Sequence, residues 1–164
     1  MIERFYVHNF RCLENFELPI SGRASSLLIG RNGTGKSTVR LALEVLQQIG
    51  RGSNRVGELL KSEDFARGRS DVPIRFEVEV MLGDTVFGYQ LALELPSGFR
   101  ELRVAEERFT VNGEEFYSRD RAQVILTKTS SRPEAKFLVD WHLVAFPIIQ
   151  FPPTLVSVES FSNG

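Results

Sequence analysis

Apolar residues recur along the chain with two different periods. Between residues 36 and 49 they fall at positions 39, 41, 43, 45, 46 and 49, which is a dense but helical spacing. From residue 74 to residue 82, apolar and polar side chains alternate almost strictly, as is typical of a strand with one buried face. The pattern therefore predicts a helix in the first third of the chain and β-structure in the second.

Turn residues divide the β-structure into successive hairpins. Gly83 and Asp84 follow the first alternating run, residues 96–98 turn the chain again, and Asn112 with Gly113 is the dipeptide most typical of a tight hairpin. Further strands are expected at 85–95, 102–111, 115–117 and 124–126, followed by a polar loop at 127–134. Residues 72–126 are therefore predicted to form an antiparallel β-meander.

The N-terminal part is expected to hold short strands at 2–7, 12–20 and 25–29, and a short helix is expected at 55–60, before a polar loop at 61–71. Cys12 falls inside the second of these strands, where a buried and unreactive thiol is the expected state. The apolar stretch 137–151 is expected to be a central strand or a contact surface for a second lobe or subunit.

Residues 30–37 carry the clearest chemical signal. They match the phosphate-binding (Walker A) pattern G-x-x-x-x-G-K-[ST] and comprise Gly30, Arg31, Asn32, Gly33, Thr34, Gly35, Lys36 and Ser37. The glycines allow successive amide groups to point at one phosphate. Lys36 would reach the β- and γ-phosphates, and the Ser37 hydroxyl would complete the coordination of Mg²⁺. The motif therefore predicts ATP and Mg²⁺ as cofactors.

The order of strand, loop and helix around the motif predicts a P-loop NTPase of the α/β fold class. We expect a single lobe over residues 1–164. Its parts are the entry strands, phosphate loop and helix (1–50), the meander (72–126), and a lobe end in contact with a second lobe (137–160). The meander argues against nucleoside kinases and small GTPases, which alternate strands and helices after the loop.

Composition narrows the choice of partners and location. The formal net charge is −1 and no run of Lys or Arg forms a basic stripe, so charge does not indicate strong nucleic-acid binding. The single cysteine excludes a disulfide framework, and His8 and His142 lack the spacing of a metal site. No stretch has the length of a membrane span and the first residues lack a signal-peptide pattern, so a cytoplasmic location is expected.

The sequences VHNFRCL at 7–13 and LIGRNGTGKST at 28–38 resemble the RecF/SMC/Rad50-like ATPases. Within that group they are most similar to AAA family ATPases that include the OLD-type proteins of bacterial defence. The resemblance implies an ABC-type first lobe that binds ATP and engages a second copy through a nucleotide sandwich. Closure of the two heads would act on a nuclease, another effector or a DNA-handling partner.

The resemblance also implies roles for three residues. Asn32 would contact the γ-phosphate region, and Thr38 would assist at the α-phosphate. Arg11 would lie near the nucleotide, although a solvated strand charge is an equally open interpretation, because arginine is usually exposed.

Hydrolysis in these ATPases needs an apolar strand ending in Asp-Glu and a signature loop. The nearest internal match is Asp140, which is followed by Trp141 where Glu is expected, so a solvated carboxylate is the more usual interpretation. Residues 161–164 resemble a signature loop only loosely, and Gln150 is either a Mg²⁺-sensing glutamine or a surface residue. We therefore expect ATP binding, with hydrolysis only if a second lobe adds these motifs. A nucleotide-ordered regulatory module is the alternative, and a nucleoside kinase is a weaker third.

Overall fold

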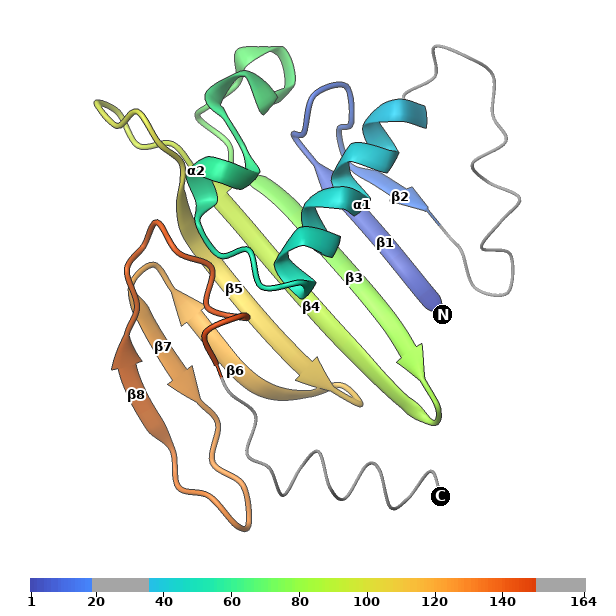
Figure 1. The fold of residues 1–164 in the computed structure, drawn as a ribbon, viewed down its shortest axis with the longest axis vertical. Coiled ribbons are helices and arrows are strands. Elements are labelled where there is room, and N and C mark those ends of the chain that lie inside the picture. Colours follow the sequence, from blue (N-terminus) through green and yellow to red (C-terminus); the bar gives the residue numbers. More distant parts are fainter. Residues whose placement is uncertain (19–35, 150–164) are drawn as a thin grey trace.

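The computed structural model describes residues 1–18 and 36–149. These residues form one eight-stranded sheet with the strand order β2-β1-β3-β4-β5-β6-β7-β8 (Figure 1). All seven pairings between neighbouring strands are antiparallel. The strands are β1 (Ile2–His8), β2 (Phe16–Leu18), β3 (Ile74–Leu82), β4 (Thr85–Glu94), β5 (Arg103–Val111), β6 (Glu114–Asp120), β7 (Gln123–Leu126) and β8 (Ala135–Leu138).

The predicted α/β fold class is wrong for this structure. An α/β fold pairs parallel strands through crossover helices that cover both faces of the sheet. Here the described residues contain one long helix, α1 (Lys36–Gly50), which lies over one face (Figure 1). The other helical segments are single turns, namely α2 (Val56–Leu59), η1 (Ser62–Asp64) and η2 (Ala66–Gly68). The reason is the series of tight turns, because a short turn can join only antiparallel strands.

The individual hairpins agree with the alternation in the sequence. β3 and β4 pair around Gly83 and Asp84, with Leu82 opposite Thr85. Asn112 and Gly113 join β5 to β6, and both have the positive φ (50° and 80°) that a type I′ turn requires. The helix expected at 36–49 and the short helix expected at 55–60 are confirmed by α1 and α2.

The structure corrects one expectation about a short segment and narrows another. Residues 12–20 were expected to be a strand, but β2 covers only three residues, and Cys12 is exposed in the turn before it rather than buried. Of the two alternatives for the stretch 137–151, a central strand is excluded over the described residues up to 149, because β8 is an edge strand that ends at Leu138. A contact surface for a second lobe or subunit stays a prediction. Val144 and Ala145 beyond it are nevertheless fully buried. The strand expected at 25–29 lies outside the described residues.

The two faces of the sheet differ in character. The inner face is apolar and packs with the buried side of α1 in one core, which includes Phe5, Val7, Ile74, Phe76, Leu91, Leu93, Val104, Val39, Ala42, Val45 and Ile49. The outer face carries charged pairs, such as Arg75 with Glu106 at 2.8 Å and Arg4 with Glu17 at 2.9 Å. An antiparallel sheet can expose one polar face while its apolar face is covered. None of the helices in the described ranges has the length and apolar character needed to cross a bilayer.

Candidate nucleotide-binding site

The loop after β1 reverses the chain through three residues with positive φ. These are Asn9 (59°), Arg11 (53°) and Asn15 (50°). Asn9 is buried, and its Nδ2 donates to the carbonyl oxygens of Arg69 (2.9 Å) and Val72 (2.7 Å). Because these bonds satisfy a buried amide, they hold the left-handed loop against the segment that leads into β3.

Asp64 fixes the position of Arg11. The Arg11 backbone N–H donates to the Asp64 carbonyl oxygen at 2.7 Å, and Arg11 Nε donates to Asp64 Oδ1 at 2.9 Å. The second carboxylate oxygen, Oδ2, accepts the backbone N–H of Lys61 at 2.8 Å. The Asp64 side chain is only 10% exposed, whereas that of Arg11 is 50% exposed. Asp64 therefore orients a guanidinium that keeps half of its surface for solvent or a ligand.

The same loop contacts the first turn of α1. Cys12 Sγ donates to Thr38 Oγ1 at 3.4 Å, and Ser37, one residue earlier, is exposed. The first turn of this fifteen-residue helix contains no acidic side chain. Its N-terminal amides and the positive end of its dipole favour an anion, and Arg11 on the adjoining loop adds positive charge. The end of α1 at which the helix begins is therefore suited to phosphate.

The structure brings together only part of the predicted site. It places Arg11 on the loop beside Thr38, with Ser37 next to it, whereas the predicted Gly30, Arg31, Asn32, Gly33, Thr34 and Gly35 and the side chain of Lys36 lie outside the described residues. Within residues 1–18 and 36–149, no three His, Cys, Asp or Glu side chains form a metal-ligating group.

A sequence model of the AAA ATPase domain matches residues 1–112, about two thirds of the chain. The chain belongs to the AAA ATPase domain family. The matched residues run from β1 through β5 and include the Walker A motif and α1. Nucleotide binding of the ATPase type is thus the general function of this domain. No curated protein and no solved structure matches the chain.

Asp140, the nearest match to the acidic residue that hydrolysis needs, makes a local hydrogen bond. Asp140 lies in a turn after β8, where its Oδ1 accepts the backbone N–H of His142 at 2.8 Å. His8 and His142 are likewise engaged locally, His8 Nδ1 with the Asn15 N–H at 2.9 Å and His142 Nδ1 with the Leu102 carbonyl oxygen at 3.2 Å. Gln150 and residues 161–164 lie outside the described residues.

A buried carboxylate on β5 was missed in the sequence. Glu107 is 1% exposed and accepts five donors from the rest of the domain. Tyr89 Oη, Tyr117 Oη and the Phe146 N–H donate to Oε2 at 2.8, 2.7 and 2.9 Å, while Arg119 Nη1 and the Ala145 N–H donate to Oε1 at 3.2 and 2.9 Å. Arg119 also donates to the carbonyl oxygens of Asp140 and Leu143. The cluster ties residues 140–146 to the sheet.

Burial shifts the ionisation of the groups around Glu107. Desolvation raises the pKa of Tyr89 well above its ordinary value, and the negative charge of Glu107 raises it further. The pKa of Tyr117 is raised for the same two reasons. Desolvation lowers the pKa of Arg119, although the adjacent Glu107 opposes this shift. Both tyrosines therefore remain hydrogen-bond donors over a wide pH range.

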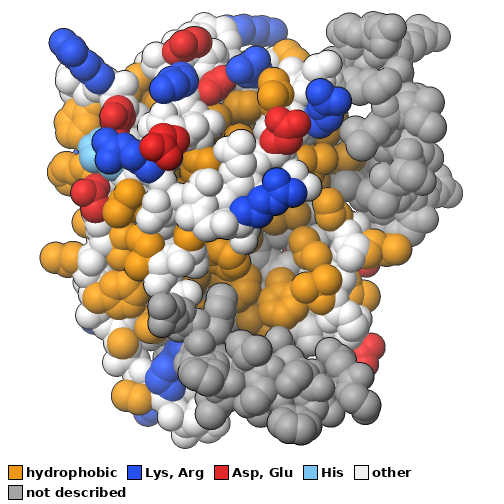
Figure 2. Space-filling view, viewed as in Figure 1, with side chains coloured by type: hydrophobic (Ala, Val, Ile, Leu, Met, Phe, Trp, Pro, Cys, Tyr) orange, Lys and Arg blue, Asp and Glu red, His pale blue; other side chains and the backbone are white. Residues whose placement is uncertain are grey.

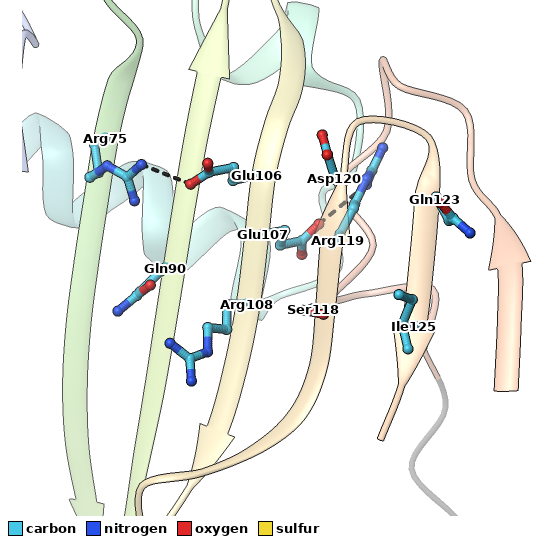
Figure 3. A pocket seen from close by; sticks show the side chains of 10 residues that line it. All are labelled: Arg75, Gln90, Glu106, Glu107, Arg108, Ser118, Arg119, Asp120, Gln123 and Ile125. Carbon is cyan, nitrogen blue, oxygen red and sulfur yellow. Dashed lines mark hydrogen bonds and ion pairs between the residues drawn. The ribbon is translucent and has the colours of Figure 1, made fainter. Parts of the chain in front are cut away.

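The described part of the sheet also has hollows away from the first turn of α1. A polar basin of about 340 Å³ is lined by residues including Arg75, Glu106, Arg108 and Asp120 (Figure 3). Arg75 pairs with Glu106 at 2.8 Å, Arg108 with Glu115 at 3.1 Å, and Asp120 with Arg121 at 3.3 Å. These charges already have partners, so the basin gives no indication of a charged ligand. A larger, apolar hollow lies on the inner face.

Proposed function

We propose that this chain is the ATP-binding lobe of a RecF/SMC-like head and that it binds ATP with Mg²⁺ through residues 30–38. One observation carries the proposal: the last two residues of the phosphate-binding motif, Lys36 and Ser37, begin α1, inside the stretch that matches the AAA ATPase domain. The contact between Cys12 and Thr38 supports it, because that contact brings the loop that carries Arg11 to the same end of the helix.

The proposed roles follow from the chemistry of each group. The amides of residues 30–35 would surround the β-phosphate, and Lys36 would neutralise charge on the β- and γ-phosphates. Asn32 would contact the γ-phosphate region, Thr38 would bind near the α-phosphate, and Ser37 would be a ligand of Mg²⁺. Arg11, held by Asp64, would approach the nucleotide from the side with its exposed guanidinium surface. The metal supplies charge neutralisation at the phosphates when it is bound.

The partners are proposed from the resemblance. Two heads would engage through their nucleotides, and the engaged state would act on a nuclease, another effector or DNA. The net charge of −1 gives no separate support for direct DNA binding by this lobe. A second lobe or subunit would complete the catalytic site.

A non-hydrolysing regulatory module is the alternative function. It is favoured by Asp140, whose carboxylate follows the edge strand β8 and accepts the backbone N–H of His142. Phosphoryl transfer depends on a positioned metal and water, so a phosphate-binding loop alone gives little rate.

Titration calorimetry with Mg²⁺-ATP tests nucleotide binding. Replacing Lys36→Ala removes a charged donor, so the affinity is expected to fall by at least about tenfold, because such hydrogen bonds contribute about 1.5–3 kcal/mol. Lys128→Ala is a matched control, since Lys128 is exposed in the loop between β7 and β8. An unchanged affinity in Lys36→Ala would disprove the assignment.

Phosphate release distinguishes the two functions. The purified chain is expected to bind ATP without steady multiple-turnover release. Turnover that is lost in Lys36→Ala would show that the chain hydrolyses ATP by itself and would rule out the regulatory module.

A further inference from the structure

The inner face of the sheet contains an apolar groove beside the C-terminal half of α1. Its volume is about 820 Å³, and it is lined mainly by apolar side chains of α1 and β3–β6, among them Leu46, Val78, Val80, Phe87, Phe109 and Phe116. Figure 2 shows hydrophobic side chains gathered over this part of the face. Aromatic rings provide much of the wall, and Phe109 and Phe116 lie edge to face at 5.9 Å. The groove is therefore suited to an apolar segment.

One cation lies at the edge of this groove. Arg132, in the loop between β7 and β8, has its guanidinium 4.6 Å from the centre of the Phe116 ring and donates from Nη2 to the Thr127 carbonyl oxygen at 3.0 Å. Its Nε is buried and has no hydrogen-bond partner among the described residues. A buried donor without a partner costs free energy, so this position favours an acceptor, above all a carboxylate. Two carboxylates, Glu114 and Glu115, also line the groove, and Glu115 pairs with Arg108 at 3.1 Å. Among the described lining residues Arg132 is the one cation, so the groove combines mainly apolar walls with a site for one negative charge at Arg132.

The sequence that follows Ile149 has the complementary composition. Residues 150–164 contain Phe151, Leu155, Val156, Val158 and Phe161, and their only charged side chain is Glu159. We propose that residues 151–161 of this chain bind in the apolar groove, with Glu159 paired to Arg132. The apolar side chains would fill the groove, and the single carboxylate would satisfy the single cation.

The end of the described chain supports this occupant. Phe146 lines the groove, and its backbone N–H donates to Glu107 Oε2 at 2.9 Å, so the described chain ends three residues after a residue of the groove wall. From β3 to β8 there are five strand spacings, or about 24 Å at about 4.8 Å each. Ten extended residues, from Ile149 to Glu159, span up to about 33 Å. The segment is therefore long enough for Glu159 to reach Arg132 of the same chain.

Binding of the hydrophobic dye ANS to the full chain tests the proposal, because the dye reports accessible apolar surface. Leu155→Asp is expected to release the segment and to raise ANS fluorescence severalfold, while circular dichroism shows the same β-structure. Leu138→Asp is the matched control, since Leu138 on β8 is 79% exposed and lies outside the groove. If Leu155→Asp and Leu138→Asp give the same low fluorescence, the segment does not occupy the groove.

A charge exchange tests the pairing separately. Arg132→Glu and Glu159→Arg are each expected to raise ANS fluorescence, and the double variant, which restores opposite charges, is expected to return it to the level of the unchanged chain. If the rise in ANS fluorescence in the double variant equals the sum of the rises in the two single variants, the two residues do not pair. Analytical ultracentrifugation and ANS fluorescence are also measured on dilution. If a dimer dissociates and the ANS fluorescence rises over the same concentration range, the groove holds the segment of a second copy and the same-chain proposal is wrong. Lys36→Ala should leave the dye signal unchanged, so this test is independent of nucleotide binding.

Discussion

Two arginine–carboxylate pairs occupy opposite kinds of environment in this domain. Arg11 and Asp64 meet at 2.9 Å in the loop beside the start of α1, and Arg119 and Glu107 meet at 3.2 Å within the core. The side chains of the core pair are fully buried, whereas half of the Arg11 side chain is exposed. The two pairs use the same chemistry at similar distances and differ mainly in access to solvent.

The difference shows how burial decides what an ion pair can do. Removing both charges of the core pair from water is costly, and the cost is offset because further donors bind Glu107 and backbone carbonyl oxygens accept from Arg119. Both side chains are fully buried, so they present no surface to a ligand. Arg11 makes one oriented contact and retains exposed surface, which is the condition for a residue that contacts phosphate.

The largest expected effect comes from breaking the core pair. Glu107→Ala leaves Arg119 and two tyrosine hydroxyls buried without their acceptor, so the free energy of unfolding should fall by about 3–5 kcal/mol. Urea denaturation measures the loss. Glu106→Ala is the neighbouring control, because its carboxylate is 62% exposed and pairs with Arg75 on the outer face, where about 0–1 kcal/mol is expected. Equal losses in both variants would contradict the contrast between the pairs.

Alkaline pH should weaken the same cluster. The pKa values of Tyr89 and Tyr117 are raised in the folded chain, so the unfolded chain loses these protons first, and stability present below about pH 10 is lost above it. With both tyrosines contributing, the free energy of unfolding should fall by about 2.7 kcal/mol per pH unit. Denaturation between pH 9 and 12 checks this slope, and Tyr89→Phe should reduce it by about half. A Tyr89→Phe slope equal to that of the unchanged chain would contradict the assignment.

The exposed pair should matter for binding more than for stability. Arg11→Ala is expected to weaken Mg²⁺-ATP binding by about tenfold, the lower end for a charged hydrogen bond, while the free energy of unfolding changes by less than about 1 kcal/mol. Calorimetry and urea denaturation give the two values. Arg121→Ala is a matched control, because that side chain is similarly exposed (54%) but lies in the turn after β6. If Arg11→Ala lowers the free energy of unfolding but leaves the affinity for Mg²⁺-ATP unchanged, Arg11 has a structural role and does not contact the nucleotide.

The smallest effect is expected at the contact between the loop and α1. Cys12→Ser replaces the thiol donor to Thr38 with a hydroxyl donor on an exposed surface, so the free energy of unfolding should change by no more than about 0.5 kcal/mol. Cys12 is the only thiol, so its labelling by a maleimide in the folded chain is expected to be complete. A thiol that reacts only after unfolding would contradict the exposed position.

The parts of the fold that depend on local chemistry were predictable from the sequence. Strict alternation placed the strand at residues 74–82, and the positive φ that Asn112 and Gly113 tolerate placed the tight turn between β5 and β6. The spacing of apolar residues placed α1 to within one residue. The fold class was predicted wrongly because it was inferred from the phosphate-binding motif, which is a local signal. The many hairpin turns, which make this sheet antiparallel, were the better guide to the fold class.

The cluster around Glu107 escaped prediction for a specific reason. β4 and β5 pair with an irregular register between Ala92 and Leu93, so the inward-facing positions of β5 change parity along the strand. If inward and outward positions alternate from the buried Val104, Glu107 should face outward with the other charges. If they alternate from the buried Phe109, Glu107 should face inward, and that is where the structure places it. The partners of Arg11 were equally hidden, because Asp64 is distant in sequence and is brought close only by the loop between α1 and β3.

The place of β1 in the sheet has a consequence for the order of folding. β1 lies between β2 and β3, and its pairing with β3 joins Ile2 to Val80 and His8 to Arg75, with α1 inside the closed loop. Strands β3 to β8 instead follow one another as hairpins, whose closure costs little chain entropy. During synthesis, β1 emerges long before its partner exists, so we expect the hairpins to form first and the N-terminal strand to join them afterwards. Until it joins, β3 is a second open sheet edge, and the loop that carries Arg11 has no fixed place beside α1.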